Sequence, residues 1–511
     1  MSMNDDLHGR NRISVNMLSS WGALSLQIVS GFVVPRLIDS KLGQDQLGVW
    51  DLSWTFVAYF GLIHGGVASS INRYVAHHNS TNDAKGINRV VSTITVVMGV
   101  MGLAILAVTA ICCASVPWIF GEKLSGNVHE LRWVVASLGA SMAIQVALSS
   151  FGGVLTGFHR WDLHNGVYAI TNIATFAAML FTLIYGGGLI GLGVSVLVCE
   201  GGGWVARWVI AYNVFPGLQV QRRLFHAATA REMILFGGKT FVPKVGDLLL
   251  NQTVSMFIVS HMGPASLALF SRPRALIGNV AQLLNKSAMV LVPTISSMNA
   301  VGEMEQIRKL LMRSSTYSNY LCLPIMLSMG IMGKELLFIW MGPHYSSGPL
   351  IMAMVFSQVL YVASTPFLFI LSGLNLHGRP GLVIFVAQCA VLVFVWAVLT
   401  FSDFGLPGVA LAVGIPLSIA NGLYIPWYAC RKVKLSVLAF FWNTWKGPLL
   451  LNLPFVCCLI LVKQVPTESA IVKLSLAALC GSSILGALYW QWVLPVELKN
   501  KLLMKIRELI K

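Results

Sequence analysis

The segment that decides the fold runs from Met233 to Thr294 and reads MILFGGKTFVPKVGDLLLNQTVSMFIVSHMGPASLALFSRPRALIGNVAQLLNKSAMVLVPT. It holds two long apolar stretches, and both carry polar and charged residues at helical spacing. The first places Thr240, Lys244, Asp247, Asn251 and Ser255 at successive spacings of 4, 3, 4 and 4, and the second places Arg272, Asn279, Gln282 and Lys286 at spacings of 7, 3 and 4. These spacings put each set on one face of a helix.

A charged side chain at the centre of a bilayer costs roughly 3 kcal/mol or more. Both polar faces are therefore predicted to look into a helix bundle or a water-filled cavity, and not into lipid. Cations outnumber carboxylates in this segment, so the cavity is predicted to carry net positive charge.

The composition of the whole chain agrees with a membrane protein. Of its 511 residues 56% are hydrophobic and 11% are charged, with a mean hydropathy of +0.74. The apolar runs are continuous over about 20 residues, which is the length of a spanning helix and unlike the short alternating strands of a transmembrane barrel. We expect an all-α polytopic membrane protein.

The net charge of +16 would suggest nucleic acid as a partner of a soluble protein. In a membrane protein it reports basic cytoplasmic loops, so no nucleic-acid partner is expected. The nine cysteines show neither metal-ligand nor disulfide-framework spacing, and no metal is expected. The N-terminus lacks a small-residue cleavage site, so the first apolar run is expected to remain as a helix.

About 14 spans meet the length criterion. Their approximate ranges are 14–38, 47–72, 90–115, 131–156, 164–186, 189–213, 233–260, 265–296, 314–338, 350–373, 381–402, 406–429, 442–463 and 471–494. Every second loop is basic, as in the loops around Arg89, Arg222 and Arg308, and the alternate loops are nearly free of Lys and Arg. This pattern predicts that both termini lie in the cytoplasm and that the number of spans is even.

A weak internal repeat at an offset of about 220 residues suggests two six-helix lobes in parallel orientation around a central cavity. Leu42-Gly43 with Leu47 corresponds in this repeat to Met262-Gly263 with Leu267. The expected domains are an N-lobe at 1–216 (helices 1–6), a C-lobe at 217–434 (helices 7–12), helices 13 and 14 at 435–495, and a basic amphipathic tail at 496–511. A chance match between apolar sequences is the alternative explanation of the residue similarity.

The candidate site residues follow from this arrangement. The cavity cations are expected to bind substrate, polar residues to line the cavity, and carboxylates to couple an ion to transport. The cations are Lys239, Lys244, Arg272, Arg274, Lys286 and Arg36. The polar lining residues are Asn251, Asn279, Gln282 and Gln27. The coupling carboxylates are Glu200, Asp51 and Asp247. Gly237-Gly238, Pro243, Pro273 and Pro366 are predicted bends or breaks. Ordinary helix packing is the alternative for each single polar residue.

Glu200 stands out in the sixth predicted span, two helical turns before Arg207. As a titratable carboxylate at membrane depth, it could take up and release H⁺ or Na⁺. A structural ion pair with Arg207 explains the same residues, and the sequence leaves both readings open. No other cofactor is expected.

The N-terminal region also resembles a known family. Pro35-Arg36-Leu37-Ile38, Leu42-Gly43, Leu47-Gly48-Val49-Trp50, Gly65-Gly66 and Asn72-Arg73-Tyr74-Val75-Ala76 resemble the polysaccharide-transport flippases of the multidrug/oligosaccharidyl-lipid/polysaccharide (MOP) exporter superfamily. The resemblance implies two lobes, alternating access and a polyprenyl-diphosphate-linked oligosaccharide as cargo in a bacterial cytoplasmic (inner) membrane. It also implies a groove for the lipid tail on the last two helices, and polysaccharide polymerase machinery as a partner.

Three other functions remain in competition with a flippase. A drug/cation antiporter of the same superfamily would need an acidic cavity, whereas the predicted cavity is cationic. A membrane glycan polymerase or ligase would need catalytic groups on a sizeable outer loop, and the outer loops here are short. A structural scaffold has no need of buried lysines.

Overall fold

The structure is a computed structural model that describes residues 29–62, 68–124, 126–467, 469–497, 499–500 and 504, without the side chains of 68–70 and 236–244. No β-strand occurs in this part of the chain, so the predicted all-α class is confirmed. Gln27, most of the first predicted span and most of the predicted amphipathic tail lie outside the described residues.

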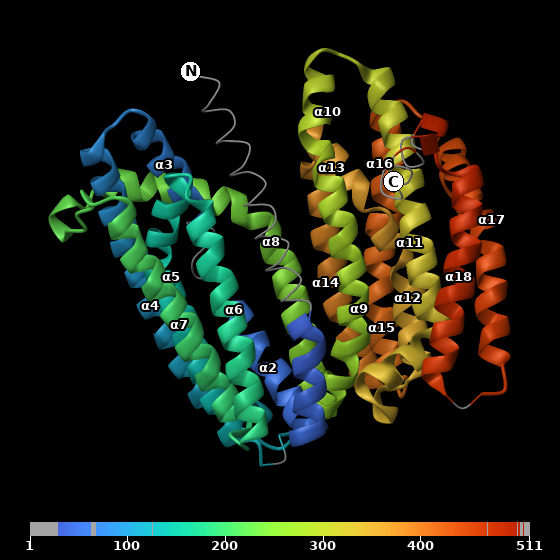
Figure 1. Ribbon diagram of the computed structural model, residues 1–511, viewed down its shortest axis with the longest axis horizontal. Helices are drawn as coiled ribbons and strands as arrows, with labels where there is room; N and C mark the ends of the chain where they lie inside the picture. The colour runs from blue at the N-terminus through green and yellow to red at the C-terminus, as the bar shows by residue number, and fades with distance from the viewer. Residues whose placement is uncertain are drawn as a thin grey trace. The chain divides into compact units, whose positions relative to one another are not determined.

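The chain is divided into two compact units, Met1–Ala268 and Leu269–Lys511 (Figure 1). The first contains α2 (Gln44–Phe60), α3 (Ala68–Ser80), α4 (Ala84–Phe120), α5 (Val128–Gly157), α6 (Trp161–Ile184), α7 (Gly188–Val214), the short 3₁₀ turn η1 (Arg222–Leu224) and α8 (Ala227–Met262), preceded by helical residues 29–42. This contact-based boundary falls inside the helix after α8, because α8 packs against α2, α3 and α4. The lobes expected from the sequence repeat stay a prediction.

The second unit continues from α9 (Pro264–Met289), which begins just before the boundary. It contains α10 (Leu291–Ala300), α11 (Met304–Met341), η2 (Pro343–Tyr345), α12 (Gly348–Ala363), α13 (Thr365–Gly373), α14 (Gly378–Phe401), α15 (Gly405–Ser418), the π-helix η3 (Ile419–Tyr424), α16 (Ile425–Lys432), α17 (Val437–Gln464) and α18 (Ala470–Trp492). The predicted span 350–373 breaks at Ser364, directly before Thr365-Pro366, whereas α9 runs through Pro273 and α8 through Pro243 without a break.

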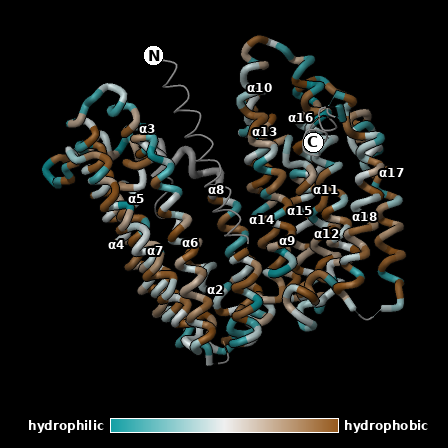
Figure 2. The backbone as a smooth tube through the Cα atoms, in the orientation of Figure 1, coloured by the Kyte–Doolittle hydropathy of each residue, from teal (hydrophilic) through white to brown (hydrophobic). Residues whose placement is uncertain are grey.

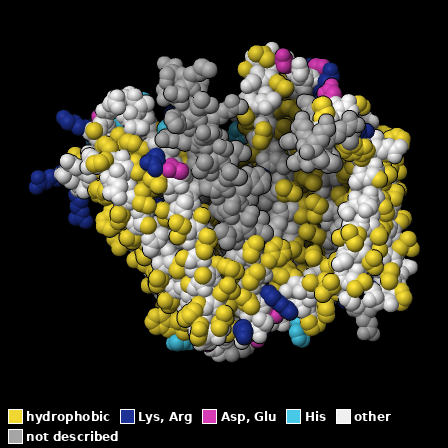
Figure 3. Space-filling model, viewed as in Figure 1, with side chains coloured by type: hydrophobic (Ala, Val, Ile, Leu, Met, Phe, Trp, Pro, Cys, Tyr) yellow, Lys and Arg dark blue, Asp and Glu magenta, His cyan; other side chains and the backbone are white. Residues whose placement is uncertain are grey.

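Within the described residues, eleven helices are long and apolar enough to cross a membrane. They coincide with eleven of the predicted spans, and Figure 2 shows their hydrophobic (brown) stretches. On the face drawn in Figure 3, hydrophobic side chains dominate and charged ones are few. α8 has the length of a span but is not among the eleven, since polar and charged residues interrupt its apolar run. The count of 14 stays a prediction.

Small residues set the helix spacing in the first unit. α5 is its central helix, with contacts to α2, α3, α4, α6 and α7. A Cβ on Gly153 would lie 2.3 Å from Ile71 Cγ2, and one on Gly157 would lie 2.6 Å from Val75 Cγ1. This small-xxx-small pattern lets α3 approach the α5 backbone, as is common between membrane helices.

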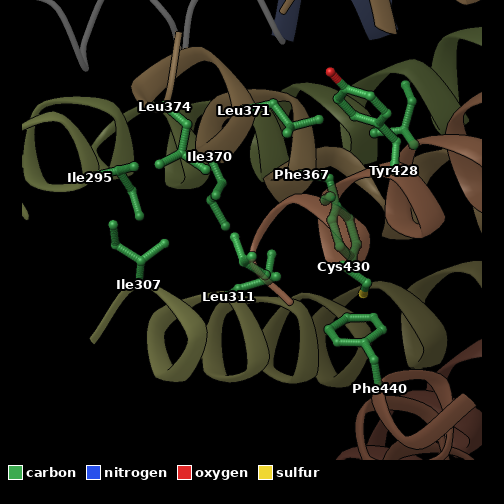
Figure 4. Close-up of a cluster of buried hydrophobic side chains, with 13 residues drawn as sticks. Ile295, Ile307, Leu311, Phe367, Ile370, Leu371, Leu374, Tyr428, Cys430 and Phe440 are labelled. Atoms are coloured by element: carbon green, nitrogen blue, oxygen red, sulfur yellow. The ribbon is translucent and has the colours of Figure 1, made fainter. Parts of the chain in front are cut away.

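The second unit has a core of large side chains from α10, α11, α13, α16 and α17. Ile295, Ile307, Leu311, Phe367, Ile370, Leu371, Tyr428, Cys430 and Phe440 meet there (Figure 4). The rings of Phe367 and Phe440 pack edge to face, with centroids 5.4 Å apart. Aromatic pairs favour this arrangement.

Side chains of neighbouring helices complete the hydrogen bonding at three prolines inside helices. A proline has no N–H, so the carbonyl four residues earlier loses its usual donor. Tyr489 Oη donates to Tyr320 O before Pro324 (2.8 Å), Asn319 Nδ2 donates to Thr444 O before Pro448 (2.9 Å), and Arg132 Nε donates to Cys113 O before Pro117 (2.8 Å). The first two bonds tie α18 and α17 to α11.

We expect Tyr489→Phe to destabilise the protein by about 1 kcal/mol, because the Tyr320 carbonyl would lose a donor in an apolar environment. In the Pro324→Ala background the restored backbone N–H supplies a donor, so the same change should cost less. Thermal unfolding of the four proteins of this double-mutant cycle in detergent measures the coupling. Equal costs of Tyr489→Phe in both backgrounds would contradict the assignment.

Asp83 caps the N-terminus of α4. Its Oδ1 accepts the Gly86 N–H at 2.8 Å, and this bond holds the pKa of the Asp83 carboxyl below its ordinary value. Its stabilising effect is therefore fully present above that ordinary value and is lost as the pH falls through the lowered pKa. We expect Asp83→Ala to lower the thermal midpoint at about pH 7 and to remove this loss in acid.

Asp83→Asn is the matched control, because asparagine caps a helix as well as aspartate does but does not titrate. Its thermal midpoint should stay near that of the native protein at neutral pH. A midpoint as low as that of Asp83→Ala would show that the charge, and not the cap, stabilises α4.

Candidate functional site

The first unit contains a partly open cavity of about 450 Å³, within the size range of small-molecule sites. Its walls come from helical residues 29–42, α2, α5, α6 and α7. The polar and aromatic residues lining it are Ser30, Trp50, Trp54, Ser141, Gln145, Tyr168, Asn172, Thr175, Glu200, Trp204 and Arg207. The cavity thus brings one carboxylate and one guanidinium together with four aromatic rings.

Arg207 is the most unusual group in this wall. Only 2% of the surface of Arg207 is exposed. Its Nε and Nη1 atoms are buried and have no hydrogen-bond partner among the described residues. The guanidinium carbon lies 4.5 Å from the centre of the Trp204 ring, so a cation–π contact compensates part of the charge. Buried donors without partners are costly and are rare in native structures.

Glu200 lines the same cavity from the same helix, α7. Among the ion pairs within 4.0 Å in the described part of the chain, none joins Glu200 to Arg207. Two opposite charges therefore line one cavity, whose wall is otherwise mostly apolar, and they interact electrostatically without forming an ion pair within 4.0 Å. Such a carboxylate is placed to meet a ligand, a water molecule or an ion that enters.

The predicted cationic residues fall in both units. On α9, Arg272 is buried and Arg274 is half-buried, whereas Asn279, Gln282 and Lys286 are exposed on one helical stripe. In the first unit Arg36 and Asp247 are exposed, and Asp51 and Asn251 are half-buried. The side chains of Lys239 and Lys244 lie outside the described set. A cavity that these residues line together stays a prediction.

The second unit carries a groove of about 510 Å³ between α11, α17 and α18. Its lining is almost wholly apolar and includes Leu321, Met332, Phe455, Leu459, Leu474, Ala477, Ala478 and Leu485, with Tyr320 and Tyr489 also in its wall. The family resemblance implied such a groove but the sequence did not identify its residues. The short side chains of Ala477 and Ala478 are the local signal that could have located it.

No cluster of three or more His, Cys, Asp or Glu residues suited to a metal ion occurs among the residues that the structure describes. The sequence analysis also missed the aromatic wall of the first cavity. Trp50 and Trp54 stand one helical turn apart, but aromatic residues make up 10% of this chain and their spacing alone is not informative.

Comparison with known structures identifies the class of protein. The inward closed conformation of the lipid II flippase MurJ matches with a TM-score of 0.69 at 12% identity, covering 94% of this chain and all of that one. An inward-facing multidrug resistance MATE family transporter of the MOP superfamily matches with a TM-score of 0.65 at 15% identity, covering 83% of this chain and 97% of that one. The fold is that of the MOP transporters, and the protein is a multi-span membrane protein.

A narrower assignment comes from the sequence. Residues 42–348 match the profile of a family described as polysaccharide biosynthesis proteins, and the chain belongs to that family. A membrane protein of Bacillus subtilis (strain 168), EpsK, described as uncharacterized, is 21% identical over 434 residues, which are 82% of this chain and 83% of EpsK. The resemblance to MOP-type polysaccharide flippases is thereby confirmed.

Proposed function

We propose that this protein is a flippase that carries a polyprenyl-diphosphate-linked oligosaccharide across the bacterial cytoplasmic membrane by alternating access. The observation that carries the proposal is the apolar groove between α11, α17 and α18, in a member of the polysaccharide biosynthesis family. A lipid-linked cargo has a hydrocarbon tail to accommodate, and an apolar groove between membrane helices can hold it.

The head group poses the opposite problem, because a diphosphate cannot enter hydrocarbon unassisted. Charge-assisted hydrogen bonds from Lys239, Lys244, Arg272, Arg274, Lys286 and Arg36 would hold it, with Gln27, Asn251, Asn279 and Gln282 as polar neighbours. The tail stays in lipid along the groove while the sugars cross in the polar lumen. The chain itself makes and breaks no covalent bond in this cycle.

The energy for directional transport is assigned to H⁺ or Na⁺ uptake at Glu200, Asp51 or Asp247, or to the membrane potential. Glu200 is the strongest of these candidates, because it shares a cavity with Arg207 without pairing to it. The alternation of basic and nearly uncharged loops supports a cytoplasmic position for both termini. Membrane lipids and polysaccharide polymerase machinery are the proposed partners.

Reconstitution of the full chain into liposomes tests the proposal. The probe is a short-chain polyprenyl-diphosphate disaccharide in the inner leaflet, and its sugar becomes accessible to an external lectin when it is flipped. The same disaccharide on a neutral lipid is the control for leakage and scrambling. Protein-dependent exposure of the diphosphate-linked probe alone is expected, and equal exposure of both probes would overturn the proposal.

Two further readouts address the competing functions. Extrusion of cationic dyes from an efflux-deficient host would favour the drug/cation antiporter, which shares the MOP fold. Lengthening of lipid-linked glycans by the purified protein would favour a polymerase or ligase. Neither result is expected from a flippase.

A further inference from the structure

The cavity of the first unit has open aromatic faces beside planar polar groups. Trp54 is 43% exposed and Tyr168 is 37% exposed, and both line the cavity. Trp50 lies one turn before Trp54 on α2. Its ring packs edge to face against the Trp54 ring, with centroids 6.0 Å apart, and so supports that ring. The wall also contains the side-chain amides of Gln145 and Asn172.

We propose that this cavity binds one pyranose ring of the transported glycan. The inference rests on the proposed function for the presence of a glycan, and it adds where and how that glycan is recognised. A pyranose presents C–H groups on its faces and hydroxyl groups around its rim. The faces pack on Trp54 and Tyr168, and the hydroxyls bond to Gln145, Asn172, Glu200 and Arg207.

The polar groups of the wall suit alternating hydroxyl donors and acceptors. Arg207 offers only donors, Glu200 when ionised offers only acceptors, and each amide offers both. Asn172 Nδ2 donates to Tyr168 O at 2.7 Å, which holds the amide beside the Tyr168 backbone. An entering hydroxyl would accept from the buried Nε and Nη1 of Arg207, for which no described residue supplies a partner.

Other occupants fit the wall less well. A lipid tail would leave the buried Nε and Nη1 of Arg207 without partners, and the apolar groove of the second unit suits it better. An organic cation would use the aromatic rings and Glu200. Arg207 already occupies one face of Trp204, however, and its positive charge repels a second cation.

The experiment measures sugar binding by saturation-transfer difference NMR on the full chain in detergent. The probes are methyl pyranosides of three kinds: neutral, N-acetylated and uronate. Saturation transfer to the ring protons of at least one pyranoside is expected. Trp54→Leu should weaken its apparent affinity by up to about tenfold, and Asn172→Ala should also reduce the signal.

Trp208→Leu is the matched control, because Trp208 is 42% exposed on α7 and does not line the cavity. It should keep the native signal. The proposal is overturned if no pyranoside binds, if Trp54→Leu and Asn172→Ala both bind as the native protein does, or if tetraphenylphosphonium displaces the bound sugar. These probes have neither a lipid tail nor a diphosphate, so the protein can fail to bind them and still flip the full probe. Loss of flipping with intact sugar binding would place the defect outside sugar recognition.

Discussion

We expect the double variant Arg272→Ala, Lys286→Ala to flip the diphosphate-linked probe roughly a hundredfold more slowly than the native protein. Each cation is assigned a charge-assisted hydrogen bond to the diphosphate, worth about 1.5–3 kcal/mol, and about 1.4 kcal/mol corresponds to a factor of ten. The lectin-accessibility assay in liposomes measures the rate.

Lys286→Gln tests the same assignment without disturbing a buried residue, since Lys286 is exposed and Arg272 is not. Lys309→Gln is its control, because Lys309 is an exposed lysine near the N-terminus of α11 that pairs only loosely with Glu305, at 3.9 Å. Undiminished flipping by Lys286→Gln and by the double variant would refute a cationic binding site on α9.

The second large effect is expected at the apolar groove. Ala478 lines the groove and is exposed, so Ala478→Trp places an indole ring in the space assigned to the lipid tail. We expect a loss of flipping of about tenfold or more, since several buried methylene groups of the tail, each worth about 0.8 kcal/mol, would be displaced. The thermal midpoint should change little, because the side chain fills existing space.

Leu479→Trp is the matched control for the groove. Leu479 is exposed on the neighbouring position of α18 but does not line the groove, so its replacement should leave both flipping and stability near the native values. Equal flipping rates for Ala478→Trp and Leu479→Trp would show that the groove does not accommodate the cargo.

The sequence predicted the positions of eleven helices well because a spanning helix is a local property. About 20 apolar residues must cover the hydrocarbon thickness, and their hydropathy reports this without reference to the rest of the chain. α8 shows the limit of the criterion. Its charges mark it as a candidate site helix, and the span predicted at 233–260 is not among the eleven found within the described residues.

The candidate site was predicted in part. Glu200 was identified because a carboxylate inside an apolar run is rare, whereas Arg207 was considered only as its structural ion-pair partner. Trp54, Tyr168 and Asn172 could not be selected, because aromatic and amide residues are common in membrane helices and only packing shows which of them share a wall. The spacing in the sequence predicted that the α9 cations share one helix face, but it did not predict which residues lie opposite that face.

From the sequence alone it was determined that this chain is an α-helical membrane protein in which every second loop is basic and some apolar runs contain charged residues. These features depend on short stretches whose hydropathy and spacing are independent of their neighbours. The tertiary structure alone decided which helices meet: Tyr489 reaching the carbonyl freed by Pro324, Arg207 lying over Trp204 in one cavity, and α11, α17 and α18 forming one groove. Many apolar helix faces are nearly equivalent in lipid, so the close fit of small residues and a few interhelical hydrogen bonds selects among them.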